Sequence, residues 1–271
     1  TEASEDTAQS EPEGSAQQDE KLPTLDEMPL PTAEALLREP PVDWIVLKYK
    51  QQVIVAEPVT PRPDTLRKLQ EAYDAKQQQR GRITGEELQR FREELEALSK
   101  LPLRLPDQVD EADYLIPAKL VEQIIHHEDL VLRRIDQLIE EDEIDLAYEL
   151  LNILRRKTPD WPGAAERHHD LLFAEAAREI ARDQWEAALV TLEELHGRAP
   201  QYPGLSQRTG TVGDRLIERA VAEGDWRRAR HSLHRLESLY TDHSIADAWS
   251  ERLLQRAEGE LAQAEQARAA G

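Results

Sequence analysis

Apolar residues in the second half of the chain follow helical spacing and return at a fixed interval. The segments that begin at Asp142, Asp183 and Gly224 align without gaps, each 41 residues after the one before. In every segment a turn leads to a large apolar residue, an alanine three positions later, and leucines four and seven positions after the alanine. This spacing places the apolar side chains on one face of a helix. The twelve positions are Ile144, Ala147, Leu151, Leu154, Trp185, Ala188, Leu192, Leu195, Trp226, Ala229, Leu233 and Leu236.

A further helix upstream of each turn completes a helical hairpin in every copy. Helical spacing predicts these first helices over residues 131–139, 171–181 and 215–222, and Pro159 and Pro200 end the second helices of the first two copies. Each hairpin is apolar on two sides and cannot bury both alone, so the copies must stack. We therefore expect the twelve positions to form the core of the stack, with both tryptophans packed between helices.

This pattern resembles the tetratricopeptide repeat family over about residues 130–255. The resemblance rests on the turn glycine Gly224, the recurring alanines, the apolar residues four and seven positions later, and the prolines that end the helices. The interval of 41 residues is longer than the family's usual ~34. In addition, Arg134, Glu175 and Leu216 stand where the first helix of that family carries a large apolar residue. The resemblance implies a right-handed superhelix whose first helices line a concave surface that holds peptides or partner proteins.

The N-terminal part of the chain has a different pattern. Residues 1–22 contain no large apolar residue before Leu22, and their Glu, Ser, Gln and Thr content is typical of a disordered acidic tether. Residues 23–62 are bracketed by prolines around one short helix at 32–38. Two β-branched runs within about 44–56 predict a small β-hairpin, whose role the sequence leaves open.

Residues 63–106 predict a helical hairpin and a linker. One helix is expected over about 64–79, and a second begins at Thr84, because Thr84 and Glu87 form a capping-box pattern. The proline-rich segment after it is expected to be a linker. Pro117 suits the first turn of a helix, so helices are expected from there onward, as a helical-repeat domain over residues 107–271.

Composition agrees with a mainly α fold and narrows the function classes. The expected architecture is an α-solenoid of three tetratricopeptide-like hairpins, preceded by a helical hairpin, a small β-hairpin and a disordered tail. The net charge of −21 disfavours nucleic-acid and anionic membrane partners, and no apolar run is long enough for membrane insertion. The chain has 0 cysteines, which excludes disulfides and thiolate catalysis.

Histidine pairs are the residues most suggestive of a metal site. Adjacent histidines on a helix point about 100° apart, so the first two pairs do not chelate one metal ion by themselves. The histidines of the third pair are three positions apart and share a helix face, where Asp242 or His243 could join them, but no His-Glu-x-x-His motif accompanies them. We expect solvated helix surface here and no metal, cofactor or catalytic residue. The pairs are His126 and His127, His168 and His169, and His231 and His234.

Basic residues on the expected first helices suggest a partner groove. Positive potential there favours acidic side chains or a C-terminal carboxylate. The alternative is that these arginines pair with glutamates of the same repeat, namely Glu175, Glu179 and Glu218. The four candidate groove residues are Arg178, Arg182, Arg215 and Arg219.

The sequence therefore predicts a non-catalytic scaffold or adaptor that binds a protein or peptide, in a larger exported bacterial protein. The alternative is an accessory domain that positions a separate enzymatic or solute-binding domain C-terminal to this chain. The polar N-terminal segment and the lack of cysteine favour a periplasmic or envelope-associated location over the cytoplasm. The partner's identity and the oligomeric state are left open.

Overall fold

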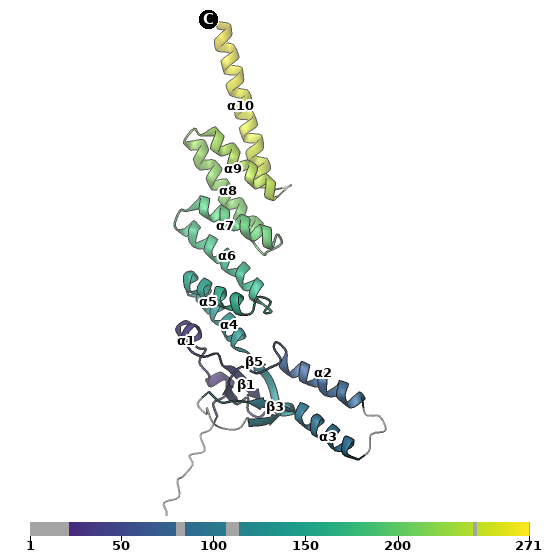
Figure 1. Ribbon diagram of the computed structural model, residues 1–271. Helices are drawn as coiled ribbons and strands as arrows, with labels where there is room; N and C mark the ends of the chain where they lie inside the picture. The colour runs from purple at the N-terminus through teal and green to yellow at the C-terminus, as the bar shows by residue number, and fades with distance from the viewer. Residues whose placement is uncertain (1–21, 80–84, 107–113, 241–242, 271) are drawn as a thin grey trace, which may run out of the picture. The chain divides into compact units, whose positions relative to one another are not determined.

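The chain is mainly α-helical (Figure 1). The structure, a computed structural model, describes residues 22–79, 85–106, 114–240 and 243–270. The chain forms two compact units, and it passes between them more than once. The first unit holds the residues up to 29, 44–57 and 65–124, and the second holds 30–43, 58–64 and the residues from 125 onward. The expected tether lies, up to residue 21, outside the described residues.

The first unit contains the predicted helical hairpin and the predicted β-hairpin. Helices α2 (Thr65–Gln78) and α3 (Glu86–Leu98) pack against each other. The predicted cap Thr84 lies outside the described residues, and α3 begins after Gly85, which has a φ of 66°. Strands β1 (Asp43–Leu47) and β2 (Val53–Ala56) confirm the β-hairpin, and a short 3₁₀ helix, η1 (Leu25–Glu27), precedes them.

The prediction of a linker over residues 101–108, of which the structure describes 101–106, is wrong at 101–103. The prediction of helices from Pro117 onward is wrong up to residue 126, because the α-helices begin only at His127. These segments form strands β3 (Lys100–Leu103), β4 (Tyr114–Pro117) and β5 (Val121–Ile125), with a short 3₁₀ helix, η2 (Ala118–Leu120), between the last two. Strand β3 pairs with β4 in antiparallel register, with Leu101 opposite Ile116, and β5 joins the other edge of β1. In β3 buried and exposed side chains alternate with a period of two, as in a strand with one buried face: Leu101 and Leu103 are buried, and Pro102 between them is exposed. Pro102 lacks an N–H donor, which an edge strand tolerates.

Helix α1 (Ala33–Arg38) begins the second unit and confirms the predicted short helix. The hydroxyl group of Thr32 accepts a hydrogen bond from the backbone N–H of Ala35 at 3.2 Å and so caps the helix. Ala33 and Leu36 are buried, and α1 packs on α4 and α5.

Helical hairpins make up the rest of the second unit (Figure 1). Each first helix packs on the second helix of its own hairpin, and the second helices α5 and α7 also pack on the next first helix. A longer helix, α10 (Ser244–Ala270), packs on α8 and α9. The hairpins pair α4 (His127–Glu140) with α5 (Ile144–Lys157), α6 (Ala164–Ala181) with α7 (Trp185–Arg198), and α8 (Leu205–Ala222) with α9 (Trp226–Leu239).

The turns that close these hairpins share one backbone conformation. Asp142, Asp183 and Gly224 have φ angles of 61°, 57° and 72°. Gly163 and Gly204, which precede α6 and α8, have φ angles of 87° and 77°. Positive φ favours glycine and is tolerated by aspartate, whose short side chain can hydrogen-bond locally. Turns at positions 41 residues apart in the sequence therefore reverse the chain in the same way.

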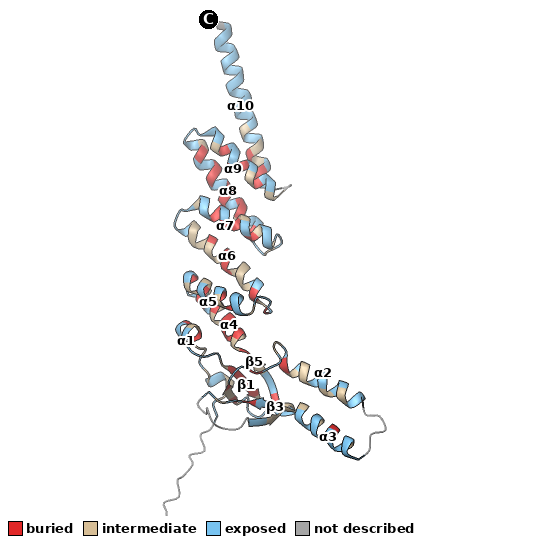
Figure 2. Ribbon diagram, viewed as in Figure 1, coloured by how far each residue is buried: buried red, intermediate tan, exposed pale blue. Residues whose placement is uncertain are grey.

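Buried residues lie on the facing sides of these helices (Figure 2). Of the twelve expected core positions, Ile144, the three alanines and the six leucines are each at most 6% exposed. Trp185 is partly buried against the core of α6 to α8. Trp226 is 40% exposed, so its assignment to the core is wrong. The guanidinium of Arg256 on α10 lies over its ring at 5.7 Å, but α10 leaves much of the ring in solvent. None of the described helices is long and apolar enough to span a membrane.

Candidate functional site

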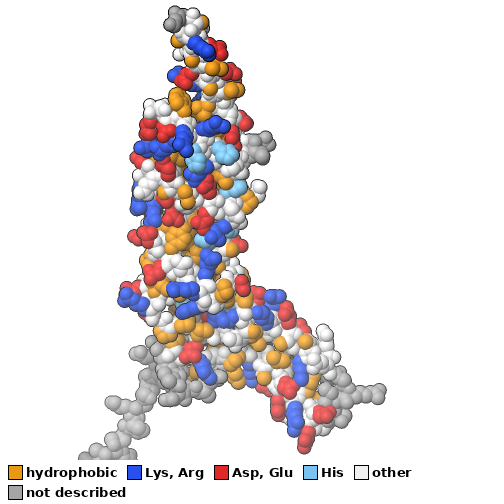
Figure 3. Space-filling view, turned by 45° about the horizontal axis from the view of Figure 1, so that its top comes forward, with side chains coloured by type: hydrophobic (Ala, Val, Ile, Leu, Met, Phe, Trp, Pro, Cys, Tyr) orange, Lys and Arg blue, Asp and Glu red, His pale blue; other side chains and the backbone are white. Residues whose placement is uncertain are grey.

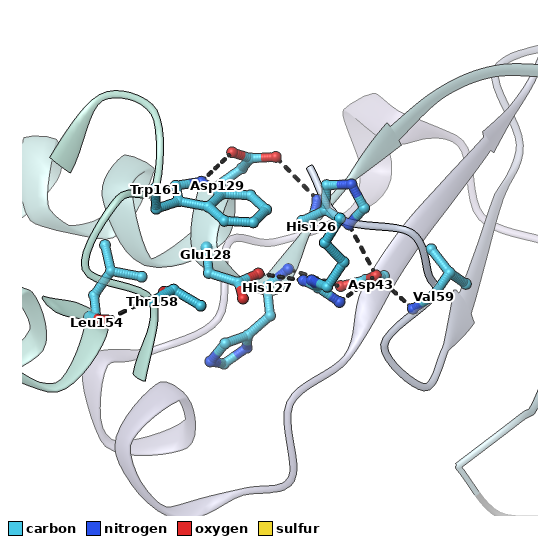
Figure 4. A network of polar contacts seen from close by, with 10 residues as sticks. Asp43, Val59, His126, His127, Glu128, Asp129, Leu154, Thr158 and Trp161 are labelled. Carbon is cyan, nitrogen blue, oxygen red and sulfur yellow. Dashed lines mark hydrogen bonds and ion pairs between the residues drawn. The ribbon is translucent and has the colours of Figure 1, made fainter. Parts of the chain in front are cut away.

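A buried carboxylate, that of Asp43, joins three segments of the second unit (Figure 4). Its Oδ2 atom accepts hydrogen bonds from the backbone N–H of Val59 at 2.9 Å and from Nη1 of Arg62 at 3.0 Å. The same oxygen lies 3.0 Å from Nδ1 of His126. Its Oδ1 atom accepts from Nη2 of Arg62 at 3.1 Å and from the backbone N–H of His127 at 2.8 Å. One side chain therefore links the start of β1, the segment 58–64 and the first turn of α4.

The charge of Asp43 is stabilised where it lies. Burial alone would raise the pKa of this carboxyl group, but the hydrogen bonds from His126, Val59 and His127 and the charge of Arg62 outweigh it and hold the pKa below its usual value. Arg62 also forms an ion pair with Glu128 on α4. A partly buried guanidinium thus lies between two carboxylates, and Asp43 is ionised at neutral pH.

The first turn of α4 extends this network to the next hairpin. His126 is the N-cap residue, and its backbone N–H donates to Oδ2 of Asp129 at 3.0 Å. The Oδ1 atom of Asp129 accepts from Nε1 of Trp161 at 3.0 Å, and the Trp161 ring meets the His126 ring edge-on at 5.5 Å. Carboxylates at a helix N-terminus also interact favourably with the helix dipole. The arrangement can hold segments in fixed positions.

Sequence reasoning missed Asp43 and Arg62. Asp43 directly precedes the buried run Trp44 to Val46, and Arg62 stands between Pro61 and Pro63. A single acid before an apolar run and an arginine between two prolines are weak signals, because both are common at exposed strand ends and loops. Only their contact with α4, 66 to 84 residues away, distinguishes them.

The histidine pairs lie in different surroundings. Burial lowers the pKa of His127, and burial together with Arg198 and Arg155 lowers that of His168. His231 and His234 lie on α9 beside a groove described below. Among the residues that the structure describes, no group of three or more His, Asp or Glu side chains could hold a metal ion.

Aromatic residues tie each hairpin to the preceding first helix. Besides the Trp161 bond to Asp129 on α4, the hydroxyl group of Tyr202 donates to Oδ1 of Asp170 on α6 at 2.7 Å. Burial and this carboxylate raise the pKa of Tyr202. In α10, Nε1 of Trp249 donates to Oδ1 of Asp214 on α8 at 2.7 Å. These bonds fix how neighbouring helices meet.

The four candidate groove arginines are mostly engaged in ion pairs. Arg178 makes two hydrogen bonds to the carboxylate of Asp145, at 3.1 and 3.2 Å. Arg215 pairs with Glu218 at 2.7 Å, as the alternative interpretation expects, and Arg219 pairs with Glu223 at 3.0 Å. Arg182 is exposed at the end of α6. Three of these four charges are therefore balanced within the chain.

A groove of about 930 Å³ lies between α9 and α10. Its apolar side chains include Trp226, Leu233 and Leu254, and Leu254 is 60% exposed. Arg227, Arg230 and the two α9 histidines also line it, together with Glu237 and with Glu260, which pairs with Arg256 at 2.8 Å. Figure 3 shows basic and histidine side chains next to hydrophobic ones towards the C-terminal end of the chain. In an acidic protein this combination of apolar and basic surface suits an acidic, apolar partner.

The first unit contains another hollow, of about 700 Å³, beside α2 and the end of α3. Lys48, Lys100 and Lys119 surround apolar residues of α2 such as Leu69 and Tyr73. Lys48 belongs to the β-hairpin segment, whose role the sequence leaves open. This hollow is the alternative location for a binding site.

No family model and no curated protein matches this chain.

Proposed function

We propose that α4 to α9 are three copies of one 41-residue helical hairpin, stacked as a tetratricopeptide-like solenoid, and that this stack is a non-catalytic scaffold for a protein partner. The observation that carries the proposal is the recurrence of one turn conformation together with a buried alanine and two buried leucines in every hairpin. A turn and a core that repeat at one interval are typical of solenoids.

A stack of this kind favours binding over catalysis. Each hairpin needs only its neighbours for stability, so side chains on the outer faces can serve a partner without disturbing the core. The buried Asp43 network supports the same conclusion, because its carboxylate accepts five hydrogen bonds and holds segments together. A general base needs a reactive group in reach and freedom to accept its proton.

Affinity capture with the full chain tests this function. The variant Ala188→Asp buries a charge where the side chain is 0% exposed, next to Leu192, and such a charge costs several kcal/mol. We expect it to unfold the hairpins locally and to abolish capture. The matched control is Ala187→Asp, which adds the same charge at an exposed position of α7.

Hydrogen exchange must show that α2, α3 and the β-hairpin stay protected in Ala188→Asp. The proposal is supported when a stoichiometric protein partner is held by the unchanged chain and by Ala187→Asp but is lost by Ala188→Asp. It is overturned when Ala188→Asp still holds the partner, because the first unit is then the binding part. Failure of the unchanged chain to hold any protein also overturns it.

A further inference from the structure

Helix α10 leaves exposed a face whose equivalent on α8 is covered. On α8 this face contains Gly213, which is buried against α9. A Cβ atom on Gly213 would lie 3.2 Å from the side chain of Leu236 on α9. The residue 41 positions after Gly213 is Leu254 on α10, which is 60% exposed, and Ala257 follows it about one turn later on the same helix. One turn further on, Leu261 is 61% exposed.

Helix α9 shows how such a face is covered. It packs its alanine and leucines on α8, and two ion pairs also hold it to α7, the second helix of the preceding hairpin. These pairs join Arg228 to Glu186 and Arg235 to Glu193, the latter at 2.5 Å. The covering helix therefore rests on one first helix and pairs its charges with the previous second helix.

The groove between α9 and α10 is the next position of this kind, and there neither of the two equivalent positions carries an acidic residue. The residues of α9 that correspond to Glu186 and Glu193, 41 positions later, are Arg227 and His234. Both line the groove, as does Arg230. A helix placed there would bring its own charges against Arg227 and Arg230, so acidic side chains fit where α9 carries arginines.

We propose that the groove between α9 and α10 binds an acidic amphipathic helix of a partner protein, in the position of the second helix of a further hairpin. The helix would carry acidic residues seven positions apart, at the places of Arg228 and Arg235. It would carry a small residue at the place of Ala229 and apolar residues four and seven positions later, to cover Leu254 and Ala257. The inference rests on the proposed scaffold function and names the partner class for it.

A synthetic helix tests this directly with the full chain. The probe has the sequence of α9, Trp226–Leu239, with Arg228→Glu and Arg235→Glu, a fluorescent label, and a lactam bridge on its solvent face that keeps it helical. The matched control probe has the unchanged α9 sequence. Fluorescence anisotropy should show the acidic probe binding about ten times more tightly than the control, with a ratio that shrinks as salt is added.

Variants of the full chain locate the binding. Leu254→Glu should weaken binding of the acidic probe at least about ten-fold. Val190→Glu, at a position on α7 that is 56% exposed and outside the groove, should leave it unchanged. Both positions are exposed, so neither change should unfold the chain, and circular dichroism checks this.

Several results would overturn the proposal. They are equal binding of both probes, no binding of either, or binding that survives Leu254→Glu. Sedimentation of the chain as a dimer that Leu254→Glu dissociates would assign the groove to a second copy instead. If capture needs folded hairpins but is unaffected by Leu254→Glu, this inference fails while the scaffold function stands; if capture survives Ala188→Asp, the scaffold function itself fails.

Discussion

Replacing Asp43 with asparagine should markedly destabilise the second unit, although the two side chains have nearly the same size. The amide nitrogen cannot accept hydrogen bonds, so only one of the two acceptor oxygens remains. Donors of the segment 58–64 and of the first turn of α4 therefore each lose an acceptor. The partly buried guanidinium of Arg62 also loses one of its two carboxylates. Removing one partner of a buried ion pair costs about 3–5 kcal/mol. Arg62 keeps Glu128, and its side chain is 17% exposed, so we expect the lower end of this range, about 3 kcal/mol.

Thermal unfolding followed by circular dichroism measures this cost. A loss of about 3 kcal/mol in a unit of this size lowers Tm by roughly 6–12 °C. Hydrogen exchange should also become faster at the backbone amides of Val59 and His127, which both donate to Asp43. The control is Asp160→Asn, because Asp160 is exposed in the same unit.

The pH dependence has a defined sign. The pKa of Asp43 is lower in the folded chain than in the unfolded one, so its contribution is complete above the unfolded value of about 3.9 and is lost as the pH falls through the folded value. The difference between the two proteins should therefore be constant near neutral pH and shrink only in strong acid. A variant that melts within 1–2 °C of the unchanged chain, roughly the effect of half a kcal/mol, would refute the assigned role of Asp43.

Three further predictions concern the second unit. Burial lowers the pKa of His127 in the folded chain, so as the pH falls below about 6.5 the unfolded chain binds a proton at this residue before the folded chain does. Urea titrations should therefore show the free energy of unfolding falling from about pH 7 to about pH 5.5, and falling less steeply in His127→Gln. An equally steep fall in both proteins would contradict this. Gly224→Ala should lower the free energy of unfolding by about 1 kcal/mol because φ is 72°. The added methyl group would have no neighbour within 4 Å, so a clash adds nothing to this cost. Gly259→Ala inside α10 should be neutral or stabilising in the same titration. Trp249→Ala should lower the free energy of unfolding by about 3–5 kcal/mol, because Trp249 is 8% exposed. Trp226→Ala should lower it by less than half as much, because Trp226 is 40% exposed. Equal losses of the two variants in thermal unfolding would contradict this difference in burial.

The sequence predicts the helical hairpins well because their signals are local. In each hairpin the turn, alanine and leucine positions lie within about a dozen residues of one another. The alanines and leucines are buried, and the turn residues have positive φ angles. The prediction that Trp226 is buried is wrong because it depends on a neighbouring hairpin. A repeat pattern assumes a neighbour on both sides, and at α9 the neighbour is α10, which lacks a second helix beside it among the described residues.

The strands and the buried network could not be predicted in the same way. Strands β3 and β5 are short, and Pro102 and Pro117 are as typical of linkers and helix starts as of edge strands. The donors that make Asp43 a buried hydrogen-bond acceptor lie 16 to 84 residues away in the sequence. Such contacts depend on how the chain returns to itself, which the periodicity of single segments does not encode.

Photo-crosslinking in cells that express the protein tests the central claim most directly. A photoreactive residue replaces Leu254 in one form of the full chain and Val190 in the other, and crosslinked peptides are sequenced by mass spectrometry. We predict that position 254 crosslinks to a helix of another protein with acidic residues seven positions apart, and that position 190 does not. Crosslinks from position 254 only to a second copy of this chain, or none at all, would contradict the claim that the groove between α9 and α10 holds a partner helix.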